Sequence, residues 1–218
     1  TMHDVTDTLR LFQTVEFRRP LEILPGIRLT FRNAGHILGS ASVALEIADR
    51  QKGDKITTLG FTGDLGRKGA AVVRDPEIIE RADILITEST YGGRHHGPMN
   101  EAKEKLARIV SESAHKGGLL IIPAFAVGRT QDVVYHLHEL MESKQIPSMP
   151  VYVDSPLATN ITEIFRQHPE CYDEETEQLL LQDGGMDPFG FNMLKYTHST
   201  DERSEERRVG KECEDLCR

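Results

Sequence analysis

The chain has 218 residues, of which 38% are hydrophobic and 28% charged, a composition typical of folded globular domains rather than of disordered segments. This length suits one large domain or two modest ones, and no apolar run approaches the roughly 20 residues that cross a bilayer. The net charge of −9 argues weakly against non-specific affinity for nucleic acid, although carboxylates that hold metal ions would also produce it.

The start of the chain and the cysteines both bear on its compartment. Residues 1–10 are polar and of mixed charge, which is not typical of a signal peptide. The three cysteines, Cys171, Cys213 and Cys217, form no CxxC pair, which predicts reduced thiols rather than a disulfide framework. Both observations predict a cytoplasmic protein.

The first part of the chain is rich in strands. Apolar residues alternate on both sides of a glycine-rich turn within 26–48, which predicts two half-buried strands. A third strand is expected over 55–61, ending in the loop 62–67. A fourth is expected over 83–87.

The later part alternates helices with strands, which predicts a parallel sheet wrapped by helices. We place a domain boundary where the pattern changes, giving domains 1–98 and 99–202. The expected elements are helices over 100–115 (with Asn100 as its cap), 128–144 and 156–168, a buried strand over 118–123 and a strand over 150–154.

Two residues at the ends of strands are candidate metal ligands. His36 lies in the glycine-rich turn between the first two strands, and Asp64 follows the third. Alone, each would usually be a solvated or hydrogen-bonded turn residue. Together, an imidazole and a carboxylate at the ends of successive strands suit a dication such as zinc.

Two helix starts are candidate phosphate sites. Arg129 and Thr130 open a helix that follows a strand, and Ser155 precedes another. Ordinary helix capping explains both equally well. Backbone N–H groups at the carboxyl edge of a parallel sheet also bind anions, so a phosphate of an RNA strand could lie there beside Arg129.

The last sixteen residues form a separate segment. Residues 203–218 are charge-dense and show no apolar face, so a solvated helix or tail is one interpretation. The string RSEERRVGKEC also resembles the translation of a sequencing-library adaptor. We therefore expect 203–218 to be non-native and exclude it from reasoning about the fold.

Five motifs in order resemble the β-CASP family of metallo-β-lactamase-fold nucleases, which includes ribonuclease J and the pre-mRNA 3′-end cleavage subunit. The resemblance extends from about Leu9 to Glu202, and five motifs at matching spacing are far more specific than any one. The motifs are AGHILGSA, FTGDLGR, ESTYGGR, PAFAVGRTQ and VDSPLA.

The resemblance implies a fold and a set of roles. The fold would be α/β, a partial metallo-β-lactamase αββα fold with an inserted parallel-sheet β-CASP domain. His36 would be a metal ligand, and Asp64 would bridge two zinc ions that cleave an RNA phosphodiester. Glu88 would be the catalytic acidic residue that orients a histidine near the scissile phosphate, as a carboxylate paired with an imidazole does.

Part of the family pattern does not occur in the chain. The HxHxDH motif, which supplies most metal ligands and precedes the position of His36, is absent, and the two later family histidines would follow residue 199. The resemblance therefore implies a chain truncated at both ends, whose parent is an enzyme and which is itself inactive.

Two other functions stay open. The parent could be a non-catalytic β-CASP scaffold of an RNA-processing complex, since inactive relatives lose metal ligands. It could also be a metallo-β-lactamase-fold hydrolase of small esters or thioesters, although the motifs after Pro123 argue against this. Single-stranded RNA is the expected partner, DNA is an alternative, a homodimer is one assembly to consider, and no membrane association is expected.

Overall fold

The structure is a computed structural model that divides into two compact units. The first comprises residues 1–67 and 75–90, and the second comprises residues 68–74 and the chain from Tyr91 onward. The domain boundary expected at 98/99 stays a prediction. The residues described are 1–49, 53, 55–95, 97–181 and 187–198.

Two of the sequence-based expectations fall largely outside the described part of the chain. The segment 203–218, expected to be non-native, lies entirely beyond it. Cys213 and Cys217 also lie beyond the described part of the chain. Cys171 is described, and it is a half-buried free thiol.

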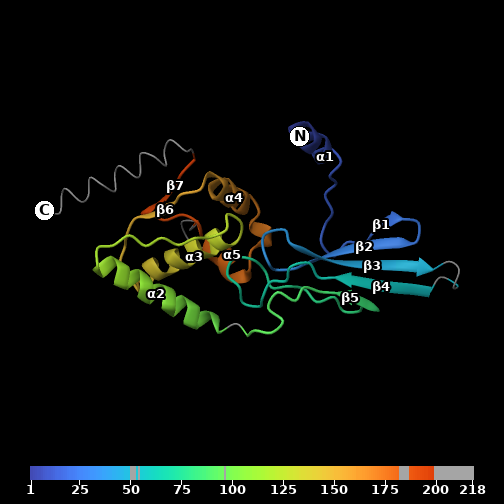
Figure 1. The fold of residues 1–218 in the computed structure, drawn as a ribbon, viewed down its shortest axis with the longest axis horizontal. Helices are drawn as coiled ribbons and strands as arrows, with labels where there is room; N and C mark the ends of the chain where they lie inside the picture. Colours follow the sequence, from blue (N-terminus) through green and yellow to red (C-terminus); the bar gives the residue numbers. More distant parts are fainter. Residues whose placement is uncertain (50–52, 54, 96, 182–186, 199–218) are drawn as a thin grey trace. The chain divides into compact units, whose positions relative to one another are not determined.

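The first unit contains one sheet and a short helix. The helix and strands are α1 (Met2–Leu9), β1 (Leu21–Leu24), β2 (Ile27–Asn33), β3 (Ala41–Asp49), β4 (Lys55–Phe61) and β5 (Ile84–Ile86). The five strands lie in the order β1-β2-β3-β4-β5 (Figure 1). The expected strands are confirmed as β2 to β5, while α1 and β1 are additions.

The strand directions bring three strand ends to one edge of this sheet. Strands β2, β3 and β4 are successively antiparallel, with Asn33 opposite Ala41 and Val43 opposite Phe61. Strand β5 is parallel to β4 and pairs Ile86 with Phe61. The carboxyl ends of β2, β4 and β5 therefore lie at the same edge, so the loops that follow them are neighbours.

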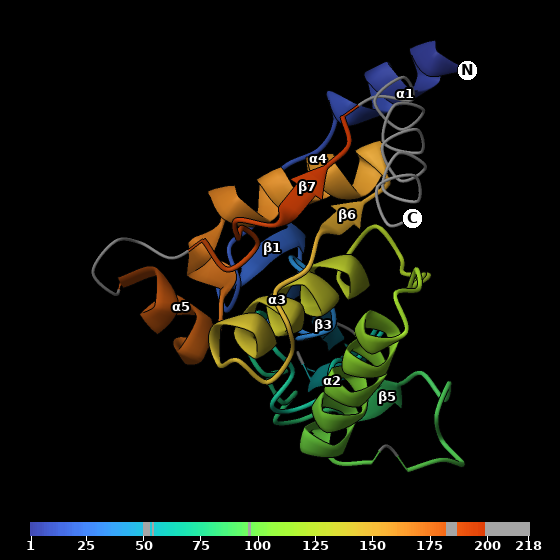
Figure 2. The same ribbon diagram turned by 90° about the vertical axis from the view of Figure 1, so that its left-hand side faces the viewer.

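The second unit combines helices with one short parallel pair of strands. Its elements are α2 (Met99–His115), α3 (Arg129–Glu142), β6 (Val151–Val153), α4 (Pro156–Gln167), the 3-10 helix η2 (Pro169–Cys171), α5 (Glu174–Leu181) and β7 (Leu194–Tyr196). Strands β6 and β7 pair in parallel, and Figure 2 shows α4 alongside them. Ser155 caps α4 and Pro156 occupies its first position, as expected.

Two apolar clusters hold the second unit together. Val110 of α2 packs with Leu137 and Leu140 of α3, each at most 4% exposed. Aromatic rings form the other cluster, in which Phe189 lies edge-on to Phe165 and Tyr172 with ring centroids 5.7 and 6.0 Å apart. Edge-to-face contacts of this kind are favourable beyond the area that they bury.

Two expectations for the second unit are wrong. Helix α2 starts after Pro98, with no side-chain cap, so Asn100 lies inside the helix. Residues 118–123 form no strand, and the side chains of Leu119 and Ile121 are 87% and 77% exposed. The apolar composition suggested burial, but none of the strands that the structure describes pairs with this segment. Only Leu120 turns toward the α2–α3 cluster.

No helix in the described part of the chain is both long enough and apolar enough to span a bilayer.

Candidate active site

The three loops at the shared edge of the first sheet carry the three predicted site residues. His36 lies in the turn 34–40 after β2, Asp64 in the loop 62–67 after β4, and Glu88 directly follows β5. The structure therefore brings these three residues to one edge. The side chains of His36 and Asp64 are exposed, and Glu88 is half-buried.

The turn that carries His36 is held by two polar side chains. The Oγ of Ser40 accepts hydrogen bonds from the backbone N–H groups of His36 and Ile37, at 3.0 and 3.2 Å. The Oδ1 of Asn33 accepts another from Gly35 at 3.0 Å. Gly35 itself has a φ of 61°, a left-handed conformation that favours glycine.

The loop that carries Asp64 is anchored by a buried threonine. The backbone N–H of Thr62 donates to the carbonyl of Ile86 at 3.0 Å, and its carbonyl accepts from the Oγ of Ser42 at 2.9 Å. Thr62 is 7% exposed, so these bonds are shielded from water. The loop is thereby fixed to both β3 and the end of β5.

The Asp64 loop also contacts the His36 turn through its backbone. The N–H of Gly66 donates to the carbonyl of Ala34 at 2.8 Å. A β-carbon on Gly66 would overlap the carbonyl group of Gly35 and lie 2.7 Å from the backbone nitrogen of His36. Only glycine allows this close approach.

The carboxylate of Glu88 is bound to the Asp64 loop. Its Oε1 accepts a hydrogen bond of 2.6 Å from the backbone N–H of Leu65. That bond, a second one from the Thr90 side chain and the proximity of His36 lower the pKa of Glu88, while slight burial opposes them. Glu88 is therefore an anion at neutral pH.

The described residues supply only part of a metal site. An imidazole and a carboxylate are ligand types that zinc prefers, and His36 and Asp64 offer one of each. Among the described residues, however, no group of three or more His, Cys, Asp or Glu side chains is placed to hold a metal ion. A metal bound at this edge would therefore need further ligands.

The predicted phosphate-binding residues lie in the second unit and make local contacts. The guanidinium of Arg129 lies 3.6 Å from the carboxylate of Asp132, one turn along α3. The backbone N–H and hydroxyl of Thr130 both donate to the carbonyl of Phe125, at 3.2 and 2.8 Å. At the other helix start, the Oγ of Ser155 accepts from Ala158 at 3.2 Å. Thr130 is thus occupied by a local contact to the preceding loop, and Ser155 by the cap of α4.

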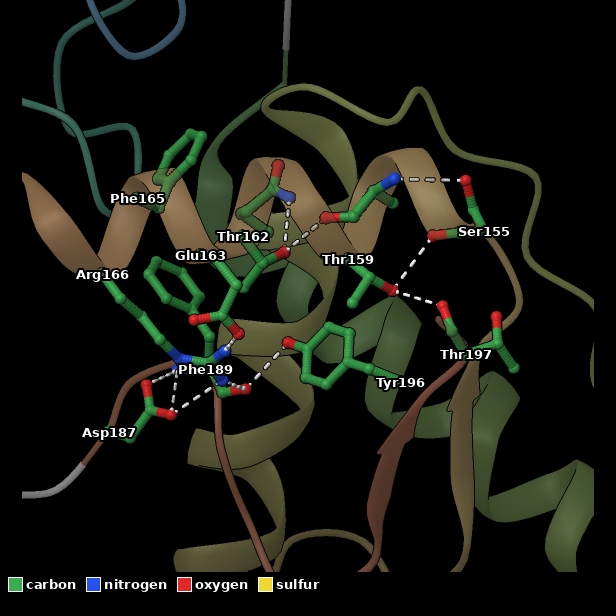
Figure 3. A network of polar contacts seen from close by, with 12 residues as sticks. Ser155, Thr159, Thr162, Glu163, Phe165, Arg166, Asp187, Phe189, Tyr196 and Thr197 are labelled. Carbon is green, nitrogen blue, oxygen red and sulfur yellow. Dashed lines mark hydrogen bonds and ion pairs between the residues drawn. The ribbon is translucent and has the colours of Figure 1, made fainter. Parts of the chain in front are cut away.

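The sequence analysis did not single out a polar network around α4 (Figure 3). The Nε and Nη2 of Arg166 lie 2.9 and 2.8 Å from Oδ2 of Asp187, and its Nη2 donates to the carbonyl of Phe189 at 3.0 Å. Arg166 also pairs with Glu163 and lies over the ring of Tyr196. Burial raises the pKa of Tyr196 to about 12, against the effect of Arg166. This network joins α4 to the segment before β7.

Ser40, Thr62 and Gly66 were also missed. The hydroxyl of Ser40 lies four residues after His36, a spacing at which serine can bond to nearby backbone N–H groups and which could have indicated its role. The contacts of Thr62 and Gly66 join residues twenty or more positions apart, so no local pattern indicates them.

Comparison with known proteins finds one matching family model and several similar curated proteins. Residues 130–214 match the family described as the Beta-Casp domain. The chain is 32% identical over 200 residues to ribonuclease TTHA0252 of Thermus thermophilus, covering 90% of this chain and 44% of that protein. It is 34% identical over 203 residues to the transcription termination factor FttA of Methanosarcina mazei, covering 91% of this chain and 31% of the factor.

A eukaryotic relative is similar to a comparable degree. The chain is 30% identical over 207 residues to endoribonuclease YSH1 of Eremothecium gossypii, covering 93% of this chain and 26% of that protein. The chain thus spans less than half the length of each of these relatives.

Proposed function

We propose that this chain, which belongs to the β-CASP family of the metallo-β-lactamase fold, is part of a metal-dependent hydrolase that cleaves RNA phosphodiester bonds. Relatives named as ribonucleases and as transcription termination factors support a role in RNA processing or decay. The observation that carries the proposal is the convergence of His36, Asp64 and Glu88 at one sheet edge, on loops that contact each other.

Each of the three residues has a proposed role. His36 and Asp64 would help to hold two zinc ions, and the site would need further ligands besides these two described residues. Bound ions of this kind offset the negative charge that develops on a phosphodiester. Glu88 stays ionised because the backbone N–H of Leu65 donates to it. Its proposed role is to orient a later histidine of the parent, other than His36, near the scissile phosphate and to stabilise the protonated form of that histidine.

Single-stranded RNA is the proposed substrate, with phosphates bound by the second unit. Arg129 is exposed and can exchange its intrahelical partner Asp132 for a phosphate oxygen. The start of α4 beside Ser155 is the other proposed contact. DNA is the alternative polymer, and a homodimer and a cytoplasmic location stay predictions.

An Asp64→Ala substitution in the full-length parent tests the proposal. Loss of the Asp64 carboxylate should abolish cleavage of labelled single-stranded RNA and reduce zinc content. The matched control is Asp49→Ala, because Asp49 ends β3 at the opposite edge of the same sheet and its loss should leave both readouts unchanged. Full activity and unchanged zinc in the Asp64 variant would remove this residue from the site.

The isolated 218-residue chain offers a second test. Because its described residues do not complete a metal site, we expect it to bind zinc weakly and to leave the same RNA intact. Robust turnover by this chain would show that the missing ligands are not needed.

A non-catalytic role is the second candidate. Relatives named as transcription termination factors favour it. The parent's upstream sequence separates the two functions, because an HxHxDH motif there is expected of the hydrolase and its absence of a scaffold. RNA binding without cleavage by the intact parent would select the scaffold.

A further inference from the structure

We propose that Ser40 and Gly66 are positioning residues, which together fix the separation between the side chains of His36 and Asp64. The inference rests on the proposed function, because it treats this edge as the reactive site. Neither Ser40 nor Gly66 would itself touch a metal or a substrate. Each acts through the backbone of a loop that carries a site residue.

Ser40 closes the turn around His36. Its hydroxyl oxygen accepts from two consecutive N–H groups, its own N–H donates to the carbonyl of Ile37 at 3.0 Å, and its carbonyl accepts from Ala34 at 3.0 Å. Four hydrogen bonds to one residue thus define the path of a seven-residue turn. Without the hydroxyl, the N–H groups of His36 and Ile37 lose their acceptor. The backbone that carries the imidazole is then no longer held in one position.

Gly66 sets the distance between the two loops. Its backbone lies against the carbonyl of Gly35, where a β-carbon cannot fit, and its N–H bonds to Ala34. The φ of Gly66 lies outside the left-handed region, so the need for glycine here is spatial rather than conformational. Any side chain at this position must push the Asp64 loop away from the His36 turn.

The same contacts explain why the two residues act jointly. Ala34 accepts from Gly66 through its carbonyl and donates to Ser40 through its N–H. The three backbones therefore form one continuous hydrogen-bonded link from the Asp64 loop to the far end of the His36 turn. A shift at either end moves one prospective ligand relative to the other, and ligand orientation strongly affects metal affinity.

The test measures metal affinity in the full-length parent by competition with a chelator. We expect Ser40→Ala and Gly66→Ala each to lower zinc affinity about 10- to 100-fold, as loss of supporting contacts around a metal site does. Ser40→Thr keeps the hydroxyl and should restore affinity. The KM for single-stranded RNA should change little while kcat falls, since the substrate is held elsewhere.

Two controls come from the second unit. Gly93→Ala adds a β-carbon that meets nothing within 4 Å, and Ser143→Ala removes a hydroxyl that bonds to the α3 backbone. Neither should alter zinc affinity. Unchanged affinity in both Ser40→Ala and Gly66→Ala, or an equal loss in the controls, would overturn the proposal.

Amide hydrogen exchange in the 218-residue chain provides a readout that needs no variant. The N–H groups of His36 and Ile37 should exchange slowly because Ser40 holds them, and exchange at the rate of an open loop would contradict the role of Ser40. A parent that binds zinc but cleaves no RNA would defeat the proposed function alone. The affinity comparison would still decide the roles of Ser40 and Gly66.

Discussion

The Glu88 carboxylate and the Leu65 backbone N–H form a 2.6 Å hydrogen bond that ties the end of β5 to the loop carrying Asp64. The pKa of Glu88 is lowered chiefly by this bond. A carboxylate with a lowered pKa in the folded state adds stability above its unfolded pKa and loses it as pH falls through the folded value. The bond thus strengthens the site edge at neutral pH and weakens in acid.

Glu88→Gln should therefore destabilise the chain in a pH-dependent way. Gln keeps an acceptor oxygen but lacks the charge, so we expect a loss of about 1 kcal/mol in the free energy of unfolding at pH 7. Urea titrations from pH 7 to pH 4 should show the difference from wild type shrinking toward acid. Glu80→Gln, at an exposed carboxylate of the same unit, is the control. A difference that stays constant with pH would contradict the role of the charge.

Lys103 and Glu139 should be energetically coupled. The Nζ of Lys103 lies 2.9 Å from one Glu139 oxygen, and the ring of His136 lies 3.0 Å from the other. Burial alone would raise the pKa of Glu139, but these two partners lower it. A double-mutant cycle with Lys103→Met and Glu139→Gln, measured by urea unfolding at pH 7, should give a coupling energy of about 0.5 to 1 kcal/mol.

The coupling should also depend on pH in a defined direction. Because the pKa of Glu139 is lowered on folding, its contribution is present above the unfolded value and is lost as pH falls through the folded value. The cycle repeated at lower pH should give a smaller coupling energy. A coupling that grows in acid would show that the ion pair is not its source.

Arg166→Lys should weaken the second unit although it preserves the charge. A lysine cannot reproduce the two contacts of the guanidinium with Asp187 or its bond to the carbonyl of Phe189. We expect a loss of about 2 kcal/mol in the free energy of unfolding. Arg108→Lys, at an exposed position of α2, should change it by less than about 0.5 kcal/mol. Equal effects would mean that the network in Figure 3 adds no stability.

Leu140 and Leu119 should respond very differently to truncation. Leu140 is fully buried in the α2–α3 cluster, and Leu119 is 87% exposed. We expect Leu140→Ala to lower the free energy of unfolding by about 3 kcal/mol and Leu119→Ala to change it by less than about 0.5 kcal/mol. Chemical denaturation of the 218-residue chain measures both. A large loss at Leu119 would show that the expected burial of 118–123 is correct after all.

Local patterns predicted the elements that local interactions determine. Alternation located β2 and β3, and Ser155 followed by Pro156 marked the start of α4. The glycine-rich turn between β2 and β3 is also a local pattern, and it indicated that His36 lies at the end of a strand. Burial of 118–123 was predicted wrongly because it depends on a pairing partner, which hydrophobic composition cannot supply.

Contacts between distant segments could not be read from the sequence. Arg166 meets Asp187 across 21 positions, and Leu65 meets Glu88 across 23. The sequence indicated Glu88 only through its motif, and it did not indicate that Leu65 would bind it. The Gly66–Gly35 approach is equally non-local, since a glycine in a loop usually reflects a turn rather than a lack of space.

The exposed segment from Leu119 to Phe125 has a consequence for handling the isolated chain. Leu119, Ile121 and Phe125 each present more than three quarters of their surface to solvent, at 87%, 77% and 84%. Exposed apolar side chains favour self-association, which salting-out ions strengthen and denaturants at low concentration relieve. Preparations of this polypeptide alone should therefore precipitate in ammonium sulfate sooner than their acidic charge suggests, and light scattering should rise with protein concentration.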